Sequence, residues 1–384
     1  MELREFRSGL DAWLDGNADE LAHDPAPPSG ASPLDVEMAQ LSKVKRLAYD
    51  AGWMRYGWPE RVGGLGGSVL CRAYLGEALA GRDLVEAGIY SMTEVLAPTM
   101  IDHAHPELAA TMVPRLLRGD ETWCQGFSEP DTGSNLAALG CWATPTERGW
   151  RVNGQKVWTS LAQYAQRCVL LVRTGSAEEA HRGTTALFVD MVDTDGRPVP
   201  GLTIRPIETM HGRLEFCEVF FDDVDVPEER ALGESGGGWG VAMDLLPYER
   251  STALWHRGAF LHRRLDQLLS TDGASLRARD VGEAYLQMFA LRSRSRATQH
   301  RLASGDHLGP ETSIDKILLA TTEQAVFDLA ATALTAEIVT GDAESDERWR
   351  SEFLYSRAAT IYGGSAEIQR NIVARRLLDL GVDR

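Results

Sequence analysis

The order of helical and strand patterns along the 384-residue chain predicts an α+β fold built from three domains. Residues up to about 120 carry apolar side chains at helical spacing, those from about 123 to 232 form short β-rich runs broken by turns, and helical spacing returns after residue 240. The strands are therefore grouped together, without the strand-helix alternation that builds a parallel sheet. We expect an N-terminal helical domain over residues 1–120, a middle β domain over 121–232 and a C-terminal helical domain over 233–384.

Composition and charge limit the classes of protein that remain. Hydrophobic residues make up 43% and charged residues 25%, which is typical of a folded globular chain. A net charge of −17 repels nucleic acid and anionic membrane surfaces, so we expect neither as a partner. The charged N-terminus and the lack of an apolar run near the ~18 residues of a membrane span favour a cytoplasmic protein. Five widely spaced cysteines without a CxxC pair predict reduced thiols, with no disulfide framework and no metal site.

In the N-terminal part, the spacing predicts helices over residues 36–53 and 72–104. Between them, the sequence GWPERVGGLGG at 57–67 is a Pro/Gly turn cluster. Residues 22–33, AHDPAPPSGASP, predict a loop or a flexible linker.

In the middle part, we expect strands at 168–175, 185–192 and 217–227. The stretch GWRVNGQKVWTS at 149–160 contains Asn153-Gly154 between strand-like flanks. That pair predicts the turn of a β-hairpin.

In the C-terminal part, helical spacing holds over four stretches, residues 241–269, 280–304, 313–339 and 365–381. Pro247 lies inside the first of them and removes one helical hydrogen bond. We therefore expect a bend in that helix beside Glu249.

One loop in the middle part suggests a bound ligand. The sequence WCQGFSEPDTGSNLAAL at 123–139 places Ser128 and Ser134 on either side of an Asp-Thr-Gly turn. Hydroxyls and free backbone amides are what a flat heteroaromatic requires when its carbonyl and ring-nitrogen edges are buried. An ordinary surface turn is the alternative for this loop taken alone.

Four motifs resemble, in this order and at these separations, the acyl-CoA dehydrogenase family. They are FSEPDTGSN, VNGQKVWTS, VFFDDVDVPEERALGESGGGWGVAMDLLPYER and IYGGSAEIQRNIVARRLLDLG, and the likeness extends to AGWMRYGWPERVGGLGG near the N-terminus. The resemblance implies an N-terminal helical domain, a middle β-barrel and a C-terminal four-helix bundle. It also implies FAD in a cleft between the last two domains and at a subunit interface.

The resemblance assigns roles to single residues. The Ser128 hydroxyl and amide match the flavin-ring contact, Trp158 the aromatic packed on the isoalloxazine, and Ser160 the hydroxyl near its reactive nitrogen. Ser365 and Glu367 match contacts to the ribityl-phosphate or adenosine portion, although Ser365 also fits a helix cap. The implied cofactor-binding set is Phe127, Ser128, Gly133, Ser134, Trp158, Thr159, Ser160, Ser365 and Glu367.

The catalytic base departs from the common pattern of the family. Many members place a Glu in a Tyr-Glu-Gly motif, which here reads Tyr362-Gly363-Gly364. A subset resembling isovaleryl-CoA dehydrogenase instead carries the Glu on the first helix after the barrel, where this chain has Glu249-Arg250. The resemblance implies Glu249 as base, Arg250 as an organising or CoA-side cation, and a branched or bulky acyl group. The implied substrate-side residues are Ser134, Arg250, Gly363 and Gly364.

A second departure concerns the grip on the cofactor. The family's Arg-x-x-Phe-Gly segment, which reaches a neighbouring subunit's FAD, has no Phe-Gly counterpart in residues 256–275. We hypothesise that a related chain supplies this half in a heteromer. Arg292, Arg294 and Arg296 are the alternative source, or a solvated helix face.

The resemblance also implies a tetramer and an electron-transfer flavoprotein as electron acceptor. Two other functions stay open. One is a flavin monooxygenase or N-hydroxylase of the same fold, and the other is a non-catalytic subunit of a heteromeric dehydrogenase.

Overall fold

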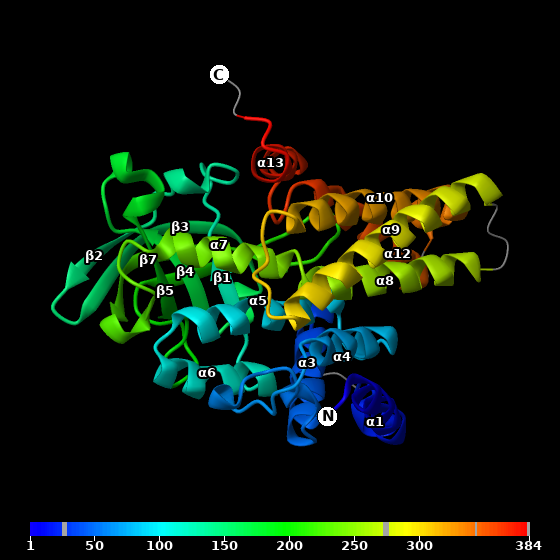
Figure 1. Cartoon of the computed structure of the whole chain (residues 1–384), viewed down its shortest axis with the longest axis horizontal. Coiled ribbons are helices and arrows are strands. Elements are labelled where there is room, and N and C mark those ends of the chain that lie inside the picture. The colour runs from blue at the N-terminus through cyan, green and yellow to red at the C-terminus, as the bar shows by residue number, and fades with distance from the viewer. Residues whose placement is uncertain (25–28, 272–275, 342–343, 382–384) are drawn as a thin grey trace.

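The computed structural model describes residues 1–24, 29–271, 276–341 and 344–381. In Figure 1 the chain passes from N-terminal helices through a sheet to a second group of helices. This order confirms the predicted α+β class. Part of the predicted loop over residues 22–33, namely 25–28, lies outside the described residues.

The N-terminal helices begin and end where local chemistry predicts. Ser32 caps α3 in a reciprocal pair with Asp35, and Pro33 is its first residue. Gly119, with a φ of 80°, ends α6. The α-helices of this part are α1 (Leu3–Gly16), α2 (Ala18–Leu21), α3 (Pro33–Asp50), α4 (Leu70–Gly81), α5 (Ala87–His103) and α6 (Pro106–Arg118), with the 3₁₀ turns η1 (Trp53–Arg55) and η2 (Glu60–Val62).

The middle part is one sheet in the order β6-β7-β3-β2-β4-β5-β8, with β1 parallel to β4. Its strands are β1 (Trp123–Gly126), β2 (Trp142–Thr146), β3 (Gly149–Ser160), β4 (Arg167–Arg173), β5 (Thr184–Asp190), β6 (Leu202–Ile207), β7 (Phe216–Pro227) and β8 (Ala231–Leu232). Strands β1 to β7 all contribute side chains to one buried cluster. The sheet therefore curls around its own core, as the strands of a barrel do.

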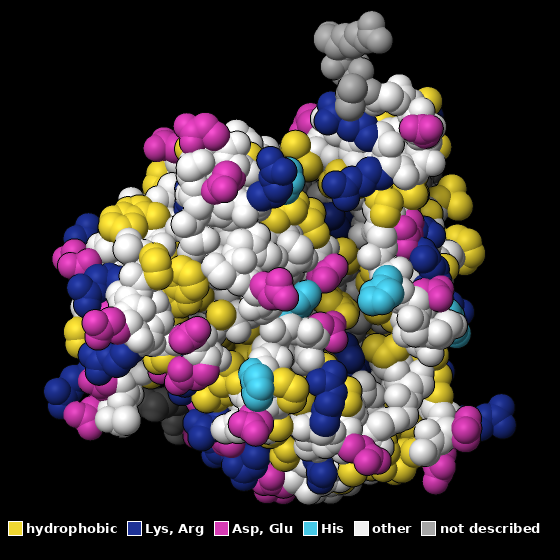
Figure 2. Space-filling view, turned by 60° about the vertical axis from the view of Figure 1, so that its left-hand side comes forward, with side chains coloured by type: hydrophobic (Ala, Val, Ile, Leu, Met, Phe, Trp, Pro, Cys, Tyr) yellow, Lys and Arg dark blue, Asp and Glu magenta, His cyan; other side chains and the backbone are white. Residues whose placement is uncertain are grey.

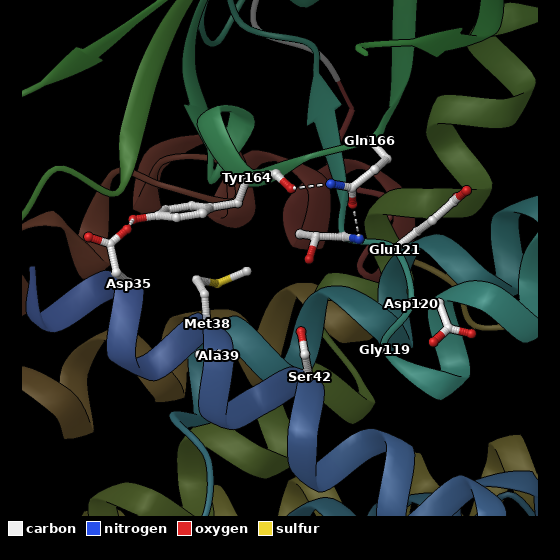
Figure 3. Close-up of a pocket in the computed structure, with 10 residues that line it drawn as sticks. Asp35, Met38, Ala39, Ser42, Gly119, Asp120, Glu121, Tyr164 and Gln166 are labelled. Atoms are coloured by element: carbon white, nitrogen blue, oxygen red, sulfur yellow. Dashed lines mark hydrogen bonds between the residues drawn. The ribbon is translucent and has the colours of Figure 1, made fainter. Parts of the chain in front are cut away.

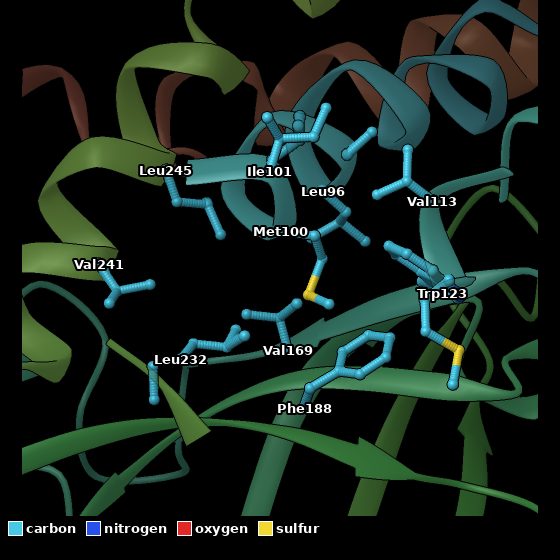
Figure 4. Close-up of a cluster of buried hydrophobic side chains, with 14 of the residues drawn as sticks. Leu96, Met100, Ile101, Val113, Trp123, Val169, Phe188, Leu232, Val241 and Leu245 are labelled. Carbon is cyan, nitrogen blue, oxygen red and sulfur yellow. The ribbon is translucent and has the colours of Figure 1, made fainter. Parts of the chain in front are cut away.

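Both faces of the sheet are covered at β4 and β5. In β4, Cys168 and Leu170 point into the enclosed core, whereas Val169 and Leu171 belong to a second cluster shared with helices α5, α6 and α7. Figure 4 shows Val169 and Phe188 of the sheet below side chains from those helices. Because alternate residues enter different cores, residues 168–172 of β4 are all apolar and lack the usual polar face.

The predicted hairpin turn at Asn153-Gly154 is wrong. Residues 149–160 form the single strand β3, and the turn lies instead at 147–148, between β2 and β3. Gly154 marks a β-bulge opposite β7, with a φ of 136°. A Cβ atom there would lie 2.6 Å from Cys141 Cα, so glycine is required by a close backbone approach and not by a turn.

All five cysteines are buried and free, as predicted. Four of them, Cys124, Cys141, Cys168 and Cys217, belong to the cluster that the sheet encloses. They act there as small apolar side chains.

The C-terminal helices are α7 (Gly238–Glu249), α8 (Thr252–Leu269), α9 (Ala278–Ala303), α10 (Thr312–Leu334), α11 (Glu337–Thr340), α12 (Glu344–Ser356) and α13 (Ala366–Ile372), followed by a π-helical turn, Val373–Leu377. Helix α7 lies on the sheet through Val241, Ala242 and Leu245, and its last residues reach the bundle (Figures 1 and 4). Since α10 packs against α8, α9, α12 and α13, it is the central helix of this bundle.

Among the described residues, α10 is the one helix long and apolar enough to cross a membrane, although 56% of its most apolar window is buried in this structure. It carries the buried charged residues Asp315, Lys316 and Glu323. We interpret α10 as the core helix of the bundle.

Acidic and basic side chains are intermixed on the face shown in Figure 2. Together with the net charge of −17, this arrangement means that an anionic ligand must meet individual arginines within a local site.

Candidate active site

The loop that follows β1 is fixed by backbone hydrogen bonds at its base. The Val157 amide of β3 donates to the Ser128 carbonyl at 2.9 Å, and Glu129 and Thr132 exchange two backbone hydrogen bonds of 3.1 Å. Ser128 is therefore held at the edge of β3, while Gly133 and Ser134 at the tip of the loop are exposed. The structure places Phe127 and Ser128 next to β3, and their contacts with a flavin stay predictions.

A buried ion pair locks the same loop. Lys156, which is 0% exposed, donates to Glu129 Oε1 at 2.7 Å and to the Phe127 carbonyl at 3.1 Å. The Glu129 carboxylate also accepts the amides of Gly140 (2.6 Å) and Cys141 (2.8 Å), which close the loop. Desolvation raises the pKa of Glu129, but Lys156 and the two amides outweigh it, so the net pKa is below its ordinary value. Sequence reasoning treated Lys156 as part of a strand and missed this role.

Trp158 stands out from the sheet next to that loop. Its backbone lies in the left-handed region, with a φ of 59°, at a register shift between Lys156 and Thr159. The side chain is 57% exposed, and its ring centroid lies 6.0 Å from that of Phe216 in an edge-on geometry. A strained backbone that exposes a large aromatic is typical of a binding surface.

Beside Trp158, the Thr159 hydroxyl is buried and has no hydrogen-bond partner among the described residues. Ser160 follows it at the end of β3 and is partly exposed. An aromatic face with an unpaired hydroxyl nearby is suited to a flat ring that has polar edges.

The predicted base and the predicted glycine turn lie together. The Glu249 Oε2 atom is 3.8 Å from the position that a Cβ atom on Gly363 would occupy. Arg250 donates from Nη2 to the Gly363 carbonyl at 3.3 Å. Gly363 and Gly364 have φ angles of 63° and 91°, a conformation that favours glycine at both positions. Helix α7 and the turn before α13, more than 100 residues apart in the chain, thus meet at one carboxylate.

The stretch expected to form one bent helix over residues 241–269 instead forms two helices that meet beside Glu249. Helix α7 ends at Glu249, two residues after Pro247, and α8 begins at Thr252. Ser251 between them has φ −124° and ψ −98°, outside helical geometry. The proline thereby ends α7 where its last side chain faces the turn.

The surroundings of Glu249 raise the pKa of its carboxyl above the ordinary value. Burial raises the pKa of Glu249, while Arg250, a hydrogen bond from the Gln125 side chain and Lys316 act to lower it. Burial lowers the pKa of Arg250, partly offset by Glu249. Gln125 lies in β1, three residues before Ser128, so it joins the base to the strand that leads into the loop. Sequence reasoning missed both residues, because Lys316 belongs to no motif and Gln125 lies before the FSEPDTGSN motif.

Ser365 and Glu367, two predicted cofactor residues, lie at the start of α13. The Ser365 hydroxyl accepts the Ile368 amide at 3.3 Å and caps α13, which confirms its structural role. The Glu367 side chain is exposed on α13, 3.9 Å from Arg370. Ser365 directly follows Gly364 of the turn, whereas Glu367 points to solvent, and the cofactor roles of both residues stay predictions.

A separate cavity of 280 Å³ lies between α3 and the start of β1 (Figure 3). Its polar groups pair with one another, since Tyr164 donates to Asp35 at 2.6 Å and the Thr122 amide donates to Gln166 at 2.6 Å. None of the predicted site residues lines this cavity. We assign no function to it.

Comparison with known proteins identifies the family. The N-terminal, middle and C-terminal domains of acyl-CoA dehydrogenases match residues 22–120, 124–224 and 236–378. The chain is 36% identical to the acyl-CoA dehydrogenase IpdE1 of Mycobacterium tuberculosis, over 99% of this chain and 98% of the relative. The chain belongs to the acyl-CoA dehydrogenase family. IpdE1 of Mycolicibacterium smegmatis is 35% identical over the same shares.

Solved structures share the fold. The steroid acyl-CoA dehydrogenase Tcur3481-Tcur3483 has a TM-score of 0.81 at 24% identity and covers 100% of this chain and 98% of that chain. The ChsE4-ChsE5 complex from Mycobacterium tuberculosis has a TM-score of 0.75 at 23% identity and covers 100% of both chains. An FAD complex of PigA has a TM-score of 0.76 at 17% identity, over 98% of this chain and 96% of that chain.

Members of this family are FAD-dependent oxidoreductases that act on the CH–CH bond of acyl-CoA in lipid metabolism, and FAD is therefore the cofactor of this acyl-CoA dehydrogenase. The residues present fit a flavin ring, because Trp158 offers an exposed aromatic face and the neighbouring Thr159 hydroxyl is a buried polar atom without a partner among the described residues.

Proposed function

We propose that this acyl-CoA dehydrogenase desaturates an acyl-CoA thioester between its α and β carbons, with Glu249 as the base. The observation that supports this role is the approach of the Glu249 carboxylate to the turn at Gly363. Gly363 stands where many family members carry the base, and its own position offers no side chain. The carboxylate at the end of α7 therefore lies beside the same turn and can act as the base there. FAD, when bound, accepts the hydride that leaves the β carbon.

The residues around the carboxylate suit proton abstraction. The α proton passes to an oxygen of Glu249, whose raised pKa makes it a stronger base than an exposed carboxylate. Arg250 holds the Gly363 carbonyl and so fixes the turn that faces the base. Its Nε atom is buried without a hydrogen-bond partner in the described part of the chain, which leaves one donor for a substrate oxygen.

For the substrate, we propose a branched or bulky acyl group. Support comes from the glycines at 363 and 364, which leave the turn without side chains, and from the steroid acyl-CoA dehydrogenase Tcur3481-Tcur3483, which has the same fold. Ser134 at the exposed loop tip stays a predicted substrate or cofactor contact.

We further propose that a second chain of the same fold completes the cofactor site. Arg292 bonds to Glu77 at 2.5 Å, and Arg294 pairs with Asp315 at 2.7 Å, so both are engaged within this chain. Only Arg296 of the three candidate arginines is exposed. These pairings weaken the idea that these arginines replace the missing Arg-x-x-Phe-Gly segment. The ChsE4-ChsE5 complex is a heteromeric example of the fold.

The exposed face of α9 also supports a partner chain. Leu286 is 69% exposed and Phe289 is 67% exposed, one helical turn apart, with exposed Tyr285 beside them. Large apolar side chains gathered on one helix face are typical of an interface. The assembly is then a homo-tetramer or a heteromer with a related chain, and we propose an electron-transfer flavoprotein as its acceptor.

The flavin-to-chain ratio tests this assembly. The chain, expressed alone and purified, should carry little flavin if a related partner is required. One tightly bound FAD per chain would instead show that a homo-oligomer completes the site and would rule out the heteromer.

Anaerobic mixing with acyl-CoA esters tests the reaction. Branched and bulky esters should bleach the oxidised flavin band, and straight-chain esters should do so more slowly. Turnover that needs reduced flavin and oxygen, with no bleaching by any ester, would favour the monooxygenase or N-hydroxylase alternative. A complete assembly with a working partner, in which Glu249→Gln changes nothing, would favour a non-catalytic subunit.

A further inference from the structure

Lysine is rare in this chain and is mostly buried. The four lysines are Lys43, Lys45, Lys156 and Lys316, among 39 basic residues. Three of these lysines are nearly inaccessible, with Lys45 3%, Lys156 0% and Lys316 4% exposed. Most positive charge on the surface therefore belongs to arginine. The three buried lysines each place a compact ammonium group, on a narrow aliphatic side chain, in the interior. Lys156 fixes the loop after β1 in this way, and we therefore looked for a loop or turn that Lys316 fixes.

Lys316 projects from α10 onto the turn that faces the base. Its Nζ atom donates to the Ala359 carbonyl at 2.5 Å and lies 4.0 Å from the centre of the Tyr362 ring. A Cβ atom on Gly363 would be 3.1 Å from Lys316 Cε and 3.8 Å from Glu249 Oε2. The lysine stem and the carboxylate therefore border the same point of the turn.

Two carboxylates, Glu323 and then Glu249, favour the charged form of Lys316. Glu323, two turns along α10, is held by Arg257 of α8 at 2.8 Å, and Arg257 also pairs with Glu352 of α12 at 3.0 Å. Tyr362 donates to Glu323 at 3.3 Å. Since Glu323 already has these partners, its attraction for Lys316 is shared.

The other charges near Lys316 lie on α7 and α9. Arg294 of α9 forms an ion pair of 2.7 Å with Asp315, the residue before Lys316. From α7, Arg250 opposes a positive charge on Lys316, and Glu249 favours it. Glu249 is therefore the carboxylate facing Lys316 that lacks an ion pair of its own among the described residues.

We propose that Lys316 is a positioning residue for the reaction, holding the turn at 359–364 and keeping the Glu249 carboxylate ionised. This inference rests on the proposed role of Glu249 as base. Lys316 acts through Glu249, and we assign it no contact with substrate or flavin.

The electrostatics of Lys316 agree with such a role. Burial lowers the pKa of Lys316 to about 8, against the raising influence of Glu323 and Glu249. The group is therefore charged at neutral pH in spite of its burial. Stability should rise as pH increases from about 8 toward the ordinary lysine value, because the unfolded chain holds this proton more tightly. The buried charge of Lys316 lowers the stability of the fold, so its presence calls for a role in function. An effect on Glu249 is such a role.

The test compares Lys316→Met, which keeps the stem and removes the charge, with Lys316→Arg, which keeps the charge. Flavin reduction by substrate is followed anaerobically across pH in the holoenzyme, with its partner chain if one is required. An opposite charge nearby lowers a carboxyl pKa by about 1 or more. In Lys316→Met we expect half-maximal reduction at a pH higher by about 1, with the rate recovering at high pH, and in Lys316→Arg a profile close to wild type.

A second readout does not depend on turnover. The infrared band of the protonated Glu249 carboxyl, identified by its loss in Glu249→Gln, should persist to higher pH in Lys316→Met. If Lys316→Met does not fold, Lys316→Gln takes its place with the same expectation. An unchanged pH midpoint and infrared titration, or a uniform rate loss at every pH, would overturn the proposal. Failure of the base assignment itself is separate, because Glu249→Gln would then remain active.

Discussion

At the scale of single residues, two buried lysines act on carboxylates of the site. Lys156 forms an ion pair with Glu129, and Lys316 and Glu249 lie beside the same turn at Gly363. Their sequence positions indicated neither role, because the scarcity of lysine is equally well explained by codon usage. Only burial in the structure distinguishes a lysine that fixes a loop from a solvent-exposed lysine.

Lys156→Met tests whether the ion pair with Glu129 fixes the loop after β1. Removing one partner of a buried ion pair costs about 3–5 kcal/mol, so the free energy of unfolding should fall by that order and flavin retention should fall with it. Urea denaturation measures the first quantity and absorbance after gel filtration the second.

The pH dependence of that variant has a defined sign. The depressed pKa of Glu129 in the native protein means that its contribution is present above the ordinary Glu value and lost as pH falls through the lower folded value. The deficit of Lys156→Met should thus be largest near neutral pH. The double variant Lys156→Met with Glu129→Gln should recover part of the loss. A double variant no more stable than the single one would contradict the assignment of the lock to this ion pair.

At the scale of elements, the sequence predicts the identity of helices and strands better than their ends. The strands predicted at 168–175, 185–192 and 217–227 agree with β4, β5 and β7 within one or two residues, since apolar spacing reflects burial directly. The hairpin at Asn153-Gly154 failed because a glycine required by close backbone approach looks the same as one required by a turn. The position of Trp158 could not be predicted either, because its exposure comes from a bulge set by pairing with β7.

Trp158→Gly tests whether the strained bulge serves the flavin. Glycine adopts the left-handed backbone of this position without the cost of about 1 kcal/mol or more that another residue has there. The flavin-free protein should therefore be as stable as wild type or more stable, while flavin affinity falls. Trp158→Phe, which keeps an aromatic face, should bind flavin more tightly than Trp158→Gly. Equal flavin affinity in all three proteins would show that the ring does not pack on this side chain.

At the scale of the whole molecule, the sheet and the bundle meet where α7 ends. The family motifs predicted both halves of this site, and the structure adds why they meet, since α7 packs on the sheet through Val241 and Leu245 and then stops at the bundle. What surrounds the site in an assembly could not be predicted in the same way. The motifs that reach a neighbouring subunit are the ones that this chain lacks.

The α9 face leads to a prediction for the assembly. Replacing Leu286 and Phe289 together by Glu should reduce the assembly mass in light scattering, because two charges cannot be buried in an apolar interface without partners. The tertiary fold should persist, since both side chains are exposed within the chain. Leu65→Glu, at another exposed apolar position in the N-terminal part, is the matched control and should leave the mass unchanged. An assembly of unaltered mass in the double variant would place the interface elsewhere.

The most direct test of Glu249 as the base is the rate of anaerobic flavin reduction by acyl-CoA in Glu249→Gln. The variant should fold and retain the oxidised flavin spectrum, since loss of a carboxyl whose pKa burial raises is not expected to destabilise the protein at neutral pH. General base catalysis contributes about 10²–10⁴-fold, so we expect the rate to fall by about a thousand-fold. A rate within about tenfold of wild type, in a flavin-loaded and folded variant, would show that another group removes the α proton.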